Sequence, residues 1–167
     1  MPTQPAPPTG RETGSDVGLK VLLSTADGGI VEHPRHYRKA ERALKKAQLR
    51  VSRRTTGSHR RRKAVPVLAK QHQHVRRHRQ DVHHQTAVAL VRAYDAIDVA
   101  AMQPAHWSRR PAPKPDEDGN GTYEHTGASR KAGVNTRLHD AGWRHFLSIL
   151  ADKAACAGKR VAAVTPA

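Results

Sequence analysis

Apolar and polar residues alternate along residues 15–23 in the pattern of a β-strand with one buried face. The apolar members of this alternation are Val17, Leu19, Val21 and Leu23. Asp16 falls on the opposite face, inside an otherwise apolar run. Because a buried charge is costly unless it is paired or binds a metal ion, this aspartate is a candidate functional residue. A hairpin with an exposed Asp16 near its start fits the same pattern equally well.

The segments on either side of this run are expected to be a disordered leader and a hairpin. Residues 1–14 are rich in Pro, Thr and Gly, a composition that predicts a disordered leader. The Asp-Gly-Gly sequence of residues 27–29 separates two apolar runs and favours a hairpin from Val21 to Glu32. Residues 15–34 are therefore expected to form the first strands of a sheet.

Residues 35–92 change to the spacing of amphipathic helices. The narrow apolar face of the first helix, which opens at Pro34, consists of Ala40, Leu44, Ala47 and Val51. The second helix runs from about residue 60 to residue 92, and its apolar residues recur at every seventh position: Leu68, Val75, Val82 and Ala89. Ser58 is placed to cap this helix, and Pro66 is expected to start its regular part or to kink it. The two helices together predict an antiparallel arm.

Residues 93–167 return to an alternation of strands and helices. Residues 94–102 predict a strand with Ile97 and Val99 on one face, and residues 160–164 predict another. Between them lie a Pro- and Gly-rich stretch at 108–129, expected to be a flexible insertion, and a helix at 135–157 that Gly158 closes. Two strands joined by a crossover helix form a parallel βαβ unit, so the fold class is expected to be α/β.

The distribution of charge indicates the kind of partner. The chain has 167 residues and carries 30 Lys and Arg against 14 Asp and Glu, a formal net charge of +16. The predicted arm alone has 18 basic residues and two acids, so it carries all of that net charge. Such a concentration favours a polyanion, and nucleic acid rather than a membrane, because no amphipathic stretch has large apolar residues on one face. The chain has no run long enough to span a membrane, which favours a cytoplasmic protein.

The candidate nucleic-acid contacts are basic residues of the arm, since guanidinium groups bind phosphate oxygens in pairs. They are Arg53, Arg54, Arg60, Arg61, Arg62, Lys63, Arg76 and Arg77. The alternative is a helical face that is merely solvated. His74 and His78 lie one helical turn apart and would suit a metal ion, but Asp81 is the only carboxylate within a turn. Contact with RNA through hydrogen bonds or stacking is the favoured role for the histidines of this arm, which also include His72, His83 and His84.

Five stretches of the chain match one family in order. They are residues 16–20, 33–41, 57–64, 130–133 and 140–143, and with them the chain resembles the OrfB/TnpB proteins of bacterial insertion sequences. The resemblance implies a partial RuvC-like domain of the ribonuclease-H-like fold, with a long basic helical hairpin inserted between strands. It also implies a four-Cys zinc ribbon, for which residues 1–167 have no counterpart.

In that family an Asp on the first strand, a Glu on a later strand and an Asp near the C-terminus hold two Mg²⁺ ions. Asp16 matches the first position, which would make it a catalytic and metal-binding residue. Ala100 stands at the Glu position and offers no oxygen, while Asp98 lies two residues away, roughly 7 Å along a strand. The third position has no counterpart, so the metal site is expected to be incomplete and no cofactor is expected to bind tightly.

The resemblance therefore predicts a truncated TnpB-type transposase, linked to DNA transposition and recombination, that binds RNA or DNA without cutting it. A nuclease-dead regulator derived from a transposon is one alternative, and a divalent-metal-dependent endonuclease is another. The expected location is the bacterial cytoplasm, with association to the nucleoid. The sequence leaves the oligomeric state and the use of a guide RNA open.

Overall fold

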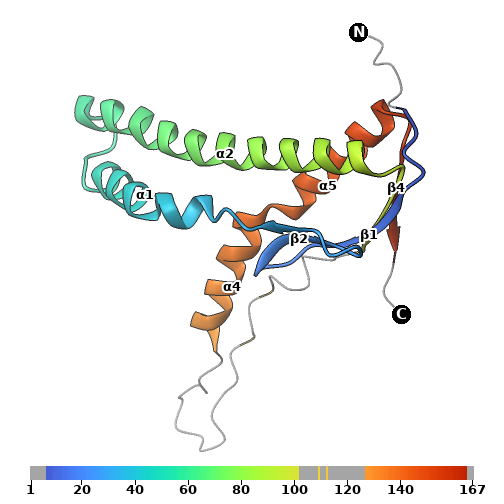
Figure 1. Cartoon of the computed structure of the whole chain (residues 1–167). Helices are drawn as coiled ribbons and strands as arrows, with labels where there is room; N and C mark the ends of the chain where they lie inside the picture. The colour runs from blue at the N-terminus through green and yellow to red at the C-terminus, as the bar shows by residue number, and fades with distance from the viewer. Residues whose placement is uncertain (1–6, 102–108, 110–111, 113–126, 165–167) are drawn as a thin grey trace, which may run out of the picture.

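The computed structural model describes residues 7–101, 109, 112 and 127–164. The chain forms an α/β fold, as expected, with helices and one sheet (Figure 1). The elements are β1 (Glu12–Asp16), β2 (Val21–Thr25), β3 (Ile30–Glu32), α1 (His36–Ser52), α2 (His59–Ala93), β4 (Ala96–Ala100), α4 (Ala128–Ala141), α5 (Trp143–Cys156) and β5 (Arg160–Val164).

The sheet has five strands in the order β3-β2-β1-β4-β5. The first three strands are antiparallel, whereas β1 pairs in parallel with β4, and β4 pairs in parallel with β5. The parallel β4–β5 pair confirms the predicted βαβ unit, with α5 in its crossover. Because β1 and β4 are parallel, they end at the same edge of the sheet, which brings residues near position 16 close to residues near position 100.

The N-terminal strands differ from the prediction in their boundaries. The alternating run is two strands, because β1 ends at Asp16 and the main-chain N–H of Gly18 donates to the carbonyl of Leu22, 3.4 Å away, across the connection. The ladder shifts register between residues 21 and 23, so Leu22 and Leu23 are both buried although they are adjacent. Residues 12–14 belong to β1 and pair with β4, an arrangement that main-chain hydrogen bonds support without apolar side chains.

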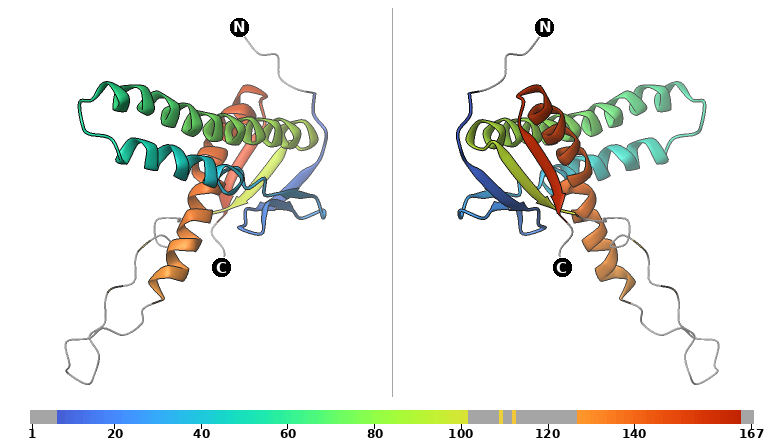
Figure 2. Two further views of the ribbon diagram at one scale, coloured as in Figure 1. Left: turned by 90° about the vertical axis from the view of Figure 1, so that its left-hand side faces the viewer. Right: turned by 90° about the vertical axis from the view of Figure 1, so that its right-hand side faces the viewer.

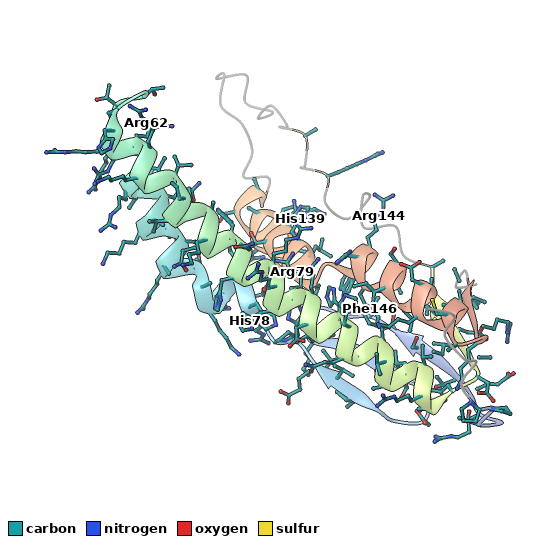
Figure 3. The ribbon with its side chains drawn as sticks, turned by 90° about the horizontal axis from the view of Figure 1, so that it is seen from above. Arg62, His78, Arg79, His139, Arg144 and Phe146 are labelled. Carbon is teal, nitrogen blue, oxygen red and sulfur yellow. The ribbon has the colours of Figure 1, made fainter. Side chains whose placement is uncertain are left out.

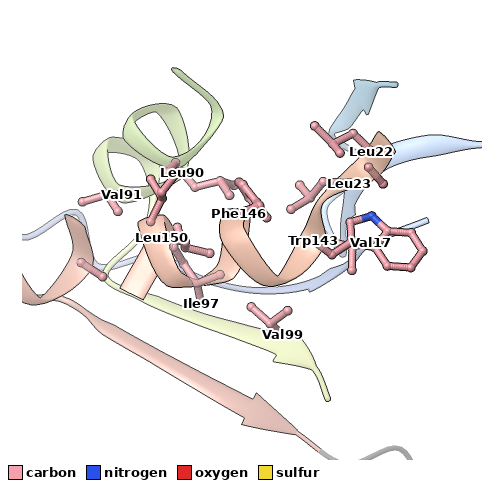
Figure 4. Packing of buried hydrophobic residues seen from close by; sticks show 14 of the residues in the cluster. Val17, Leu22, Leu23, Leu90, Val91, Ile97, Val99, Trp143, Phe146 and Leu150 are labelled. Carbon is pink, nitrogen blue, oxygen red and sulfur yellow. The ribbon is translucent and has the colours of Figure 1, made fainter. Parts of the chain in front are cut away.

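The core lies between one face of the sheet and the helices α2 and α5. Figure 4 shows Leu90 and Val91 of α2, Phe146 and Leu150 of α5 and the strand residues of the sheet in one cluster. The strands show the expected alternation: Thr13 and Ser15 of β1 are buried, whereas the three residues between and beside them are exposed. Asp16 is therefore on the face away from this core. Of the two alternatives that the sequence left open for this residue, the structure has the exposed aspartate.

Helices α1 and α2 form the predicted antiparallel arm, which extends away from the sheet (Figures 1 and 2). Leu44 and Ala47 of α1 are buried, as expected for its narrow apolar face. The Ser58 hydroxyl accepts a hydrogen bond from the main-chain N–H of Arg61 at 3.2 Å, which confirms the predicted cap. Pro66 lies inside α2, which begins seven residues earlier than the proline.

The seven-residue spacing predicted for α2 holds in its middle and fails at its end. Val75 is buried, but Ala89 is exposed. The buried residues of the last part of the helix are His83, Thr86, Ala87, Leu90 and Val91. Ala87, Leu90 and Val91 of this part pack with α5 and strand residues in the core, so a different side of the helix faces the protein interior.

The predicted helix at 135–157 is two helices that meet at Gly142. Gly142 has a φ of 62°, and its main-chain N–H closes α4 on the carbonyl of Leu138 at 3.2 Å. A positive φ favours glycine, which explains why this residue stands at the break. Helix α4 begins at Ala128, within the stretch expected to be flexible, and nearly all of the remainder of residues 108–129 lies outside the described residues.

Candidate nucleic-acid interface and carboxylate edge

The free end of the arm has a basic hollow of about 620 Å³. Its lining residues come from the end of α1, the connecting loop and the start of α2: Lys46, Leu49, Arg50, Arg53, Arg54, Thr55, Ser58 and Arg60. Five of these eight residues are Lys or Arg and none is acidic. We call this surface the tip hollow. It brings together three predicted contact residues, Arg53, Arg54 and Arg60.

Lys46 and Arg50 belong to the same surface and were missed by the sequence reasoning. Their signal is helical spacing: positions 46, 50 and 53 follow one another at four and three residues, so they share a side of α1. These cations form a row on one side of α1 that ends at Arg53 and Arg54 of the connecting loop.

The side chain of Arg61 is bound within the protein itself. Its Nη1 donates to the carbonyl of Val51 at 3.1 Å and to the carbonyl of Arg54 at 3.2 Å. Val51 lies in the last turn of α1, where main-chain acceptors lack helical donors, and Arg54 lies in the loop that follows. Arg61 therefore joins the end of α1 to the start of α2 and fixes the shape of the tip hollow.

The remaining predicted contact residues lie along α2. Arg62 and Lys63 are exposed near the tip, and Figure 3 shows Arg62 at the far end of the arm. Arg76 lines a second, open hollow of about 710 Å³ with Pro66, Ala69, Lys70, His72 and Gln73. Arg76 and Arg77 lie about 24 Å from Arg60 at a rise of about 1.5 Å per residue. The predicted residues thus form a series along the arm and not one cluster.

Few of the positive charges of the arm are neutralised within it. Among the described residues, Lys45 pairs with Glu41 at 3.2 Å and Arg79 pairs with Asp140 at 3.3 Å. No other Lys or Arg of the arm has an ion pair in the part of the chain that the structure describes. A surface of uncompensated cations attracts polyanions and raises their local concentration.

The histidines of the arm divide into two groups. His78 stacks on His36 at a ring distance of 5.7 Å and contacts His74 edge-on at 4.2 Å. Burial, and next the electrostatic effect of the neighbouring His78, lower the pKa of His36. Within the described ranges, no three metal-ligating side chains come together, so the His74–His78 pair gains no third ligand.

His83 is a core residue, contrary to the role expected from the sequence. Its side chain is 1% exposed, and its Nε2 lies 3.0 Å from the carbonyl oxygen of Ala141. Burial lowers its pKa to about 4, so the ring is neutral at pH 7. A neutral and buried imidazole does not reach RNA.

The arm is joined to the rest of the protein at residues 140–143, one of the stretches on which the family resemblance depends. The buried carboxylate of Asp140 accepts the main-chain N–H of Tyr37, at 3.1 Å, and pairs with Arg79. Figure 3 shows Arg79 on α2, where this helix passes the two C-terminal helices. A Cβ at Gly142 would lie 3.1 Å from Arg79 Cδ and 3.3 Å from His83 Cε1, so a larger residue would crowd this joint. We call these contacts the arm joint.

The carboxylate edge lies at the other side of the molecule, where β1 and β4 end. Ser15 is opposite Val99 in the parallel ladder, which places Asp16 next to Ala100. These residues line a shallow hollow of about 500 Å³ together with Gly14, Ser24, Thr25, Ala26, Asp98 and Val164. The structure therefore brings together the two positions that the family resemblance aligned.

The residues of this edge do not fit a two-metal site. Two metal ions need several converging carboxylates, and the described residues contain no group of three such ligands. Ala100 supplies no oxygen atom. Asp98 stands opposite Gly14 in the ladder, two residues before Ala100, and its Oδ1 lies 3.9 Å from Nη1 of Arg160 on β5.

A mixed sheet with a polycationic helical arm defines an α/β protein whose exposed charge suits a nucleic acid. The OrfB_IS605 family model, described as "Probable transposase", matches residues 1–109, about two thirds of the chain. The chain belongs to this family of transposases. In the described residues, no helix is long and apolar enough to cross a membrane.

Two curated relatives share the name "Putative RNA-guided DNA endonuclease". The protein from Streptomyces pristinaespiralis is 34% identical over 93 residues, which are 56% of this chain and 23% of the relative. The Escherichia coli K12 protein InsQ is 26% identical over 165 residues, 98% of this chain and 39% of the relative. The chain therefore corresponds to less than half the length of either relative.

Proposed function

We propose that this chain is the nucleic-acid-binding region of a TnpB-type transposase, and that its arm binds the phosphates of RNA or DNA. The observation that carries the proposal is the tip hollow, where five cations meet without an acid. Family membership and the names of the two relatives support nucleic acid as the polyanion.

The sheet is proposed to be the RuvC-like, ribonuclease-H-like part of that protein. Three antiparallel strands followed by two parallel ones, in the order β3-β2-β1-β4-β5, support this assignment. We further propose that the carboxylate edge does not cut nucleic acid, because Ala100 stands beside Asp16. A nuclease-dead regulator would use the same arm and the same binding chemistry in the cell, and both roles belong in the bacterial cytoplasm.

Binding is tested by fluorescence anisotropy with a 16-base-pair DNA duplex and an RNA of the same length, in a salt series. The tip variant Arg50→Gln/Arg53→Gln/Arg60→Gln removes three cations of the hollow. The control variant Arg92→Gln/Arg144→Gln/Lys153→Gln removes the same charge from residues that line none of the hollows described above.

The tip variant is expected to bind at least tenfold more weakly than the wild type in low salt. Its plot of log K against log salt is expected to be shallower by about 2 to 3, since each lost phosphate contact removes about 0.9 from the slope. The control variant should stay within about threefold of the wild type. Equal losses in the two variants would mean that net charge alone governs binding, and the tip hollow would have no special role.

A further inference from the structure

Another basic hollow lies at the base of the arm, between α1, α4 and the segment that precedes α1. It has a volume of about 360 Å³ and is lined by Leu19, His33, Arg35, Tyr37, Arg38, Glu41, Gly133, Thr136, Arg137 and Asp140. We call it the base hollow. Three arginines from two separate parts of the chain, Arg35, Arg38 and Arg137, point to an anionic ligand.

The two acids in the wall of the base hollow do not cancel these arginines. Glu41 pairs with Lys45 on the same helix, and Asp140 is used by Arg79 and by the N–H of Tyr37. Arg35, Arg38 and Arg137 have no ion pair in the described part of the chain. The hollow therefore presents three guanidinium groups whose charge no neighbouring carboxylate neutralises.

The base hollow also has a fixed position relative to the sheet. Asp140 belongs to both the hollow and the arm joint, because its carboxylate holds the first turn of α1 and Arg79 of α2. Arg137 lies three residues earlier on α4, so it is attached to the same joint. The joint thus fixes the helices from which Arg38 and Arg137 extend, and residues on a fixed backbone lose less entropy when they bind an anion than residues of a free loop.

We propose that the base hollow binds a backbone phosphate of the same nucleic acid that the tip hollow binds. This inference rests on the proposed function and adds a second contact point to it. Arg38 and Arg53, one at each hollow, are 15 residues apart along α1, which is about 22 Å at a rise of about 1.5 Å per residue. Phosphates of one strand of a B-form duplex repeat at about 3.4 Å along the axis, so the two hollows are about six to seven base pairs apart.

The separation of the hollows predicts a dependence on length. A duplex with a stem of four base pairs reaches one hollow at a time, whereas a stem of eight or more base pairs reaches both. Contact with both hollows is expected to raise affinity more steeply between four and eight base pairs than between eight and sixteen. The arm would in this way select for a minimum length of duplex.

The test compares three variants on DNA hairpins with stems of 4, 8, 12 and 16 base pairs and one common loop, by fluorescence anisotropy in a salt series. They are the base variant Arg35→Gln/Arg38→Gln/Arg137→Gln, the tip variant and the control variant defined above. Circular dichroism of each variant shows that the helices are intact before binding is measured.

The base variant is expected to lose the steep rise between four and eight base pairs and to bind the 16-base-pair stem at least tenfold more weakly. Its salt slope on that stem should fall by about 1 to 2, the loss of one or two phosphate contacts. If only the tip variant loses affinity and the base variant matches the control, the inference is overturned and the proposed function stands. If the tip and base variants both match the control, the inference and the proposed function fail together.

Discussion

The arm and the carboxylate edge belong to the same chain but depend on their residues in different ways. The arm carries 18 basic residues and two acids, and its candidate contacts are spread over the tip hollow, the base hollow and the side of α2 around Arg76. The carboxylate edge depends on single positions, and there one alanine removes the oxygen that a metal ion would need. Binding by summed charge tolerates the loss of one residue, whereas metal chemistry at a small site does not.

The largest expected effect is a pH dependence of the free energy of unfolding, caused by His83 where the arm meets the core. In the folded protein, burial lowers the pKa of His83 to about 4, below the value of about 6.5 in the unfolded chain. As the pH falls from 6.5 to 4, His83 is therefore protonated in the unfolded chain but stays neutral in the folded protein. The free energy of unfolding should decrease over that range, by at most about 3 kcal/mol from this group.

The His83→Gln variant isolates that contribution, because glutamine keeps a donor for the carbonyl of Ala141 and does not titrate. Urea unfolding at pH 7.5, 6.0 and 4.5 is expected to show a weaker pH dependence in the variant than in the wild type. The same slope in both proteins would contradict the role given to His83.

A smaller effect is expected at the arm joint itself. Asp140→Ala leaves Arg79 and the N–H of Tyr37 without their acceptor, which should lower the free energy of unfolding by about 1–3 kcal/mol. Hydrogen exchange at Tyr37 should speed up, while exchange in the core strand β4 changes less. If the arm and the sheet lose protection equally, the joint is not a separate contact between two regions.

The smallest effect is expected at the carboxylate edge. Ala100 is half-buried on the face away from the core, so Ala100→Glu should change the free energy of unfolding by about 0.5 kcal/mol or less. The added carboxylate next to Asp16 should let Mn²⁺ raise the melting temperature of the variant. The wild type, measured with the same Mn²⁺ concentration and with EDTA, should show no such shift. A shift of equal size in the wild type would show that the edge already binds metal without a glutamate.

Sequence patterns predicted the elements of the fold better than their ends. The parallel strands and the two arm helices followed from periodicity, because each buries one regular face. The break at Gly142 was missed, since glycine inside an apolar helical pattern does not by itself show a positive φ. The alternation through residues 15–23 predicts one strand, but the chain turns between Asp16 and Val21 and forms two. The burial of both Leu22 and Leu23 depends on the register shift between β2 and β3, which no local pattern records.

The candidate site was predictable where it depends on composition and not where it depends on tertiary contacts. The basic loop gave Arg53, Arg54 and Arg60, and the family resemblance aligned Asp16 with Ala100, which the ladder then placed side by side. Arg61 could not be separated from its neighbours by sequence, since its contacts are main-chain carbonyls at the end of α1 and in the loop after it. His83 looked like the other histidines of the arm until the packing of α5 buried it.

The most direct measurement follows binding and cutting in one sample, with a labelled 16-base-pair duplex and the wild-type, Asp16→Ala and tip variants, in Mg²⁺ and in EDTA. The wild type and Asp16→Ala are expected to bind equally well in both conditions and to leave the duplex intact, while the tip variant binds weakly. Cleavage by the wild type that needs Mg²⁺ and disappears in Asp16→Ala would contradict the proposed function, because the carboxylate edge would then be an active site.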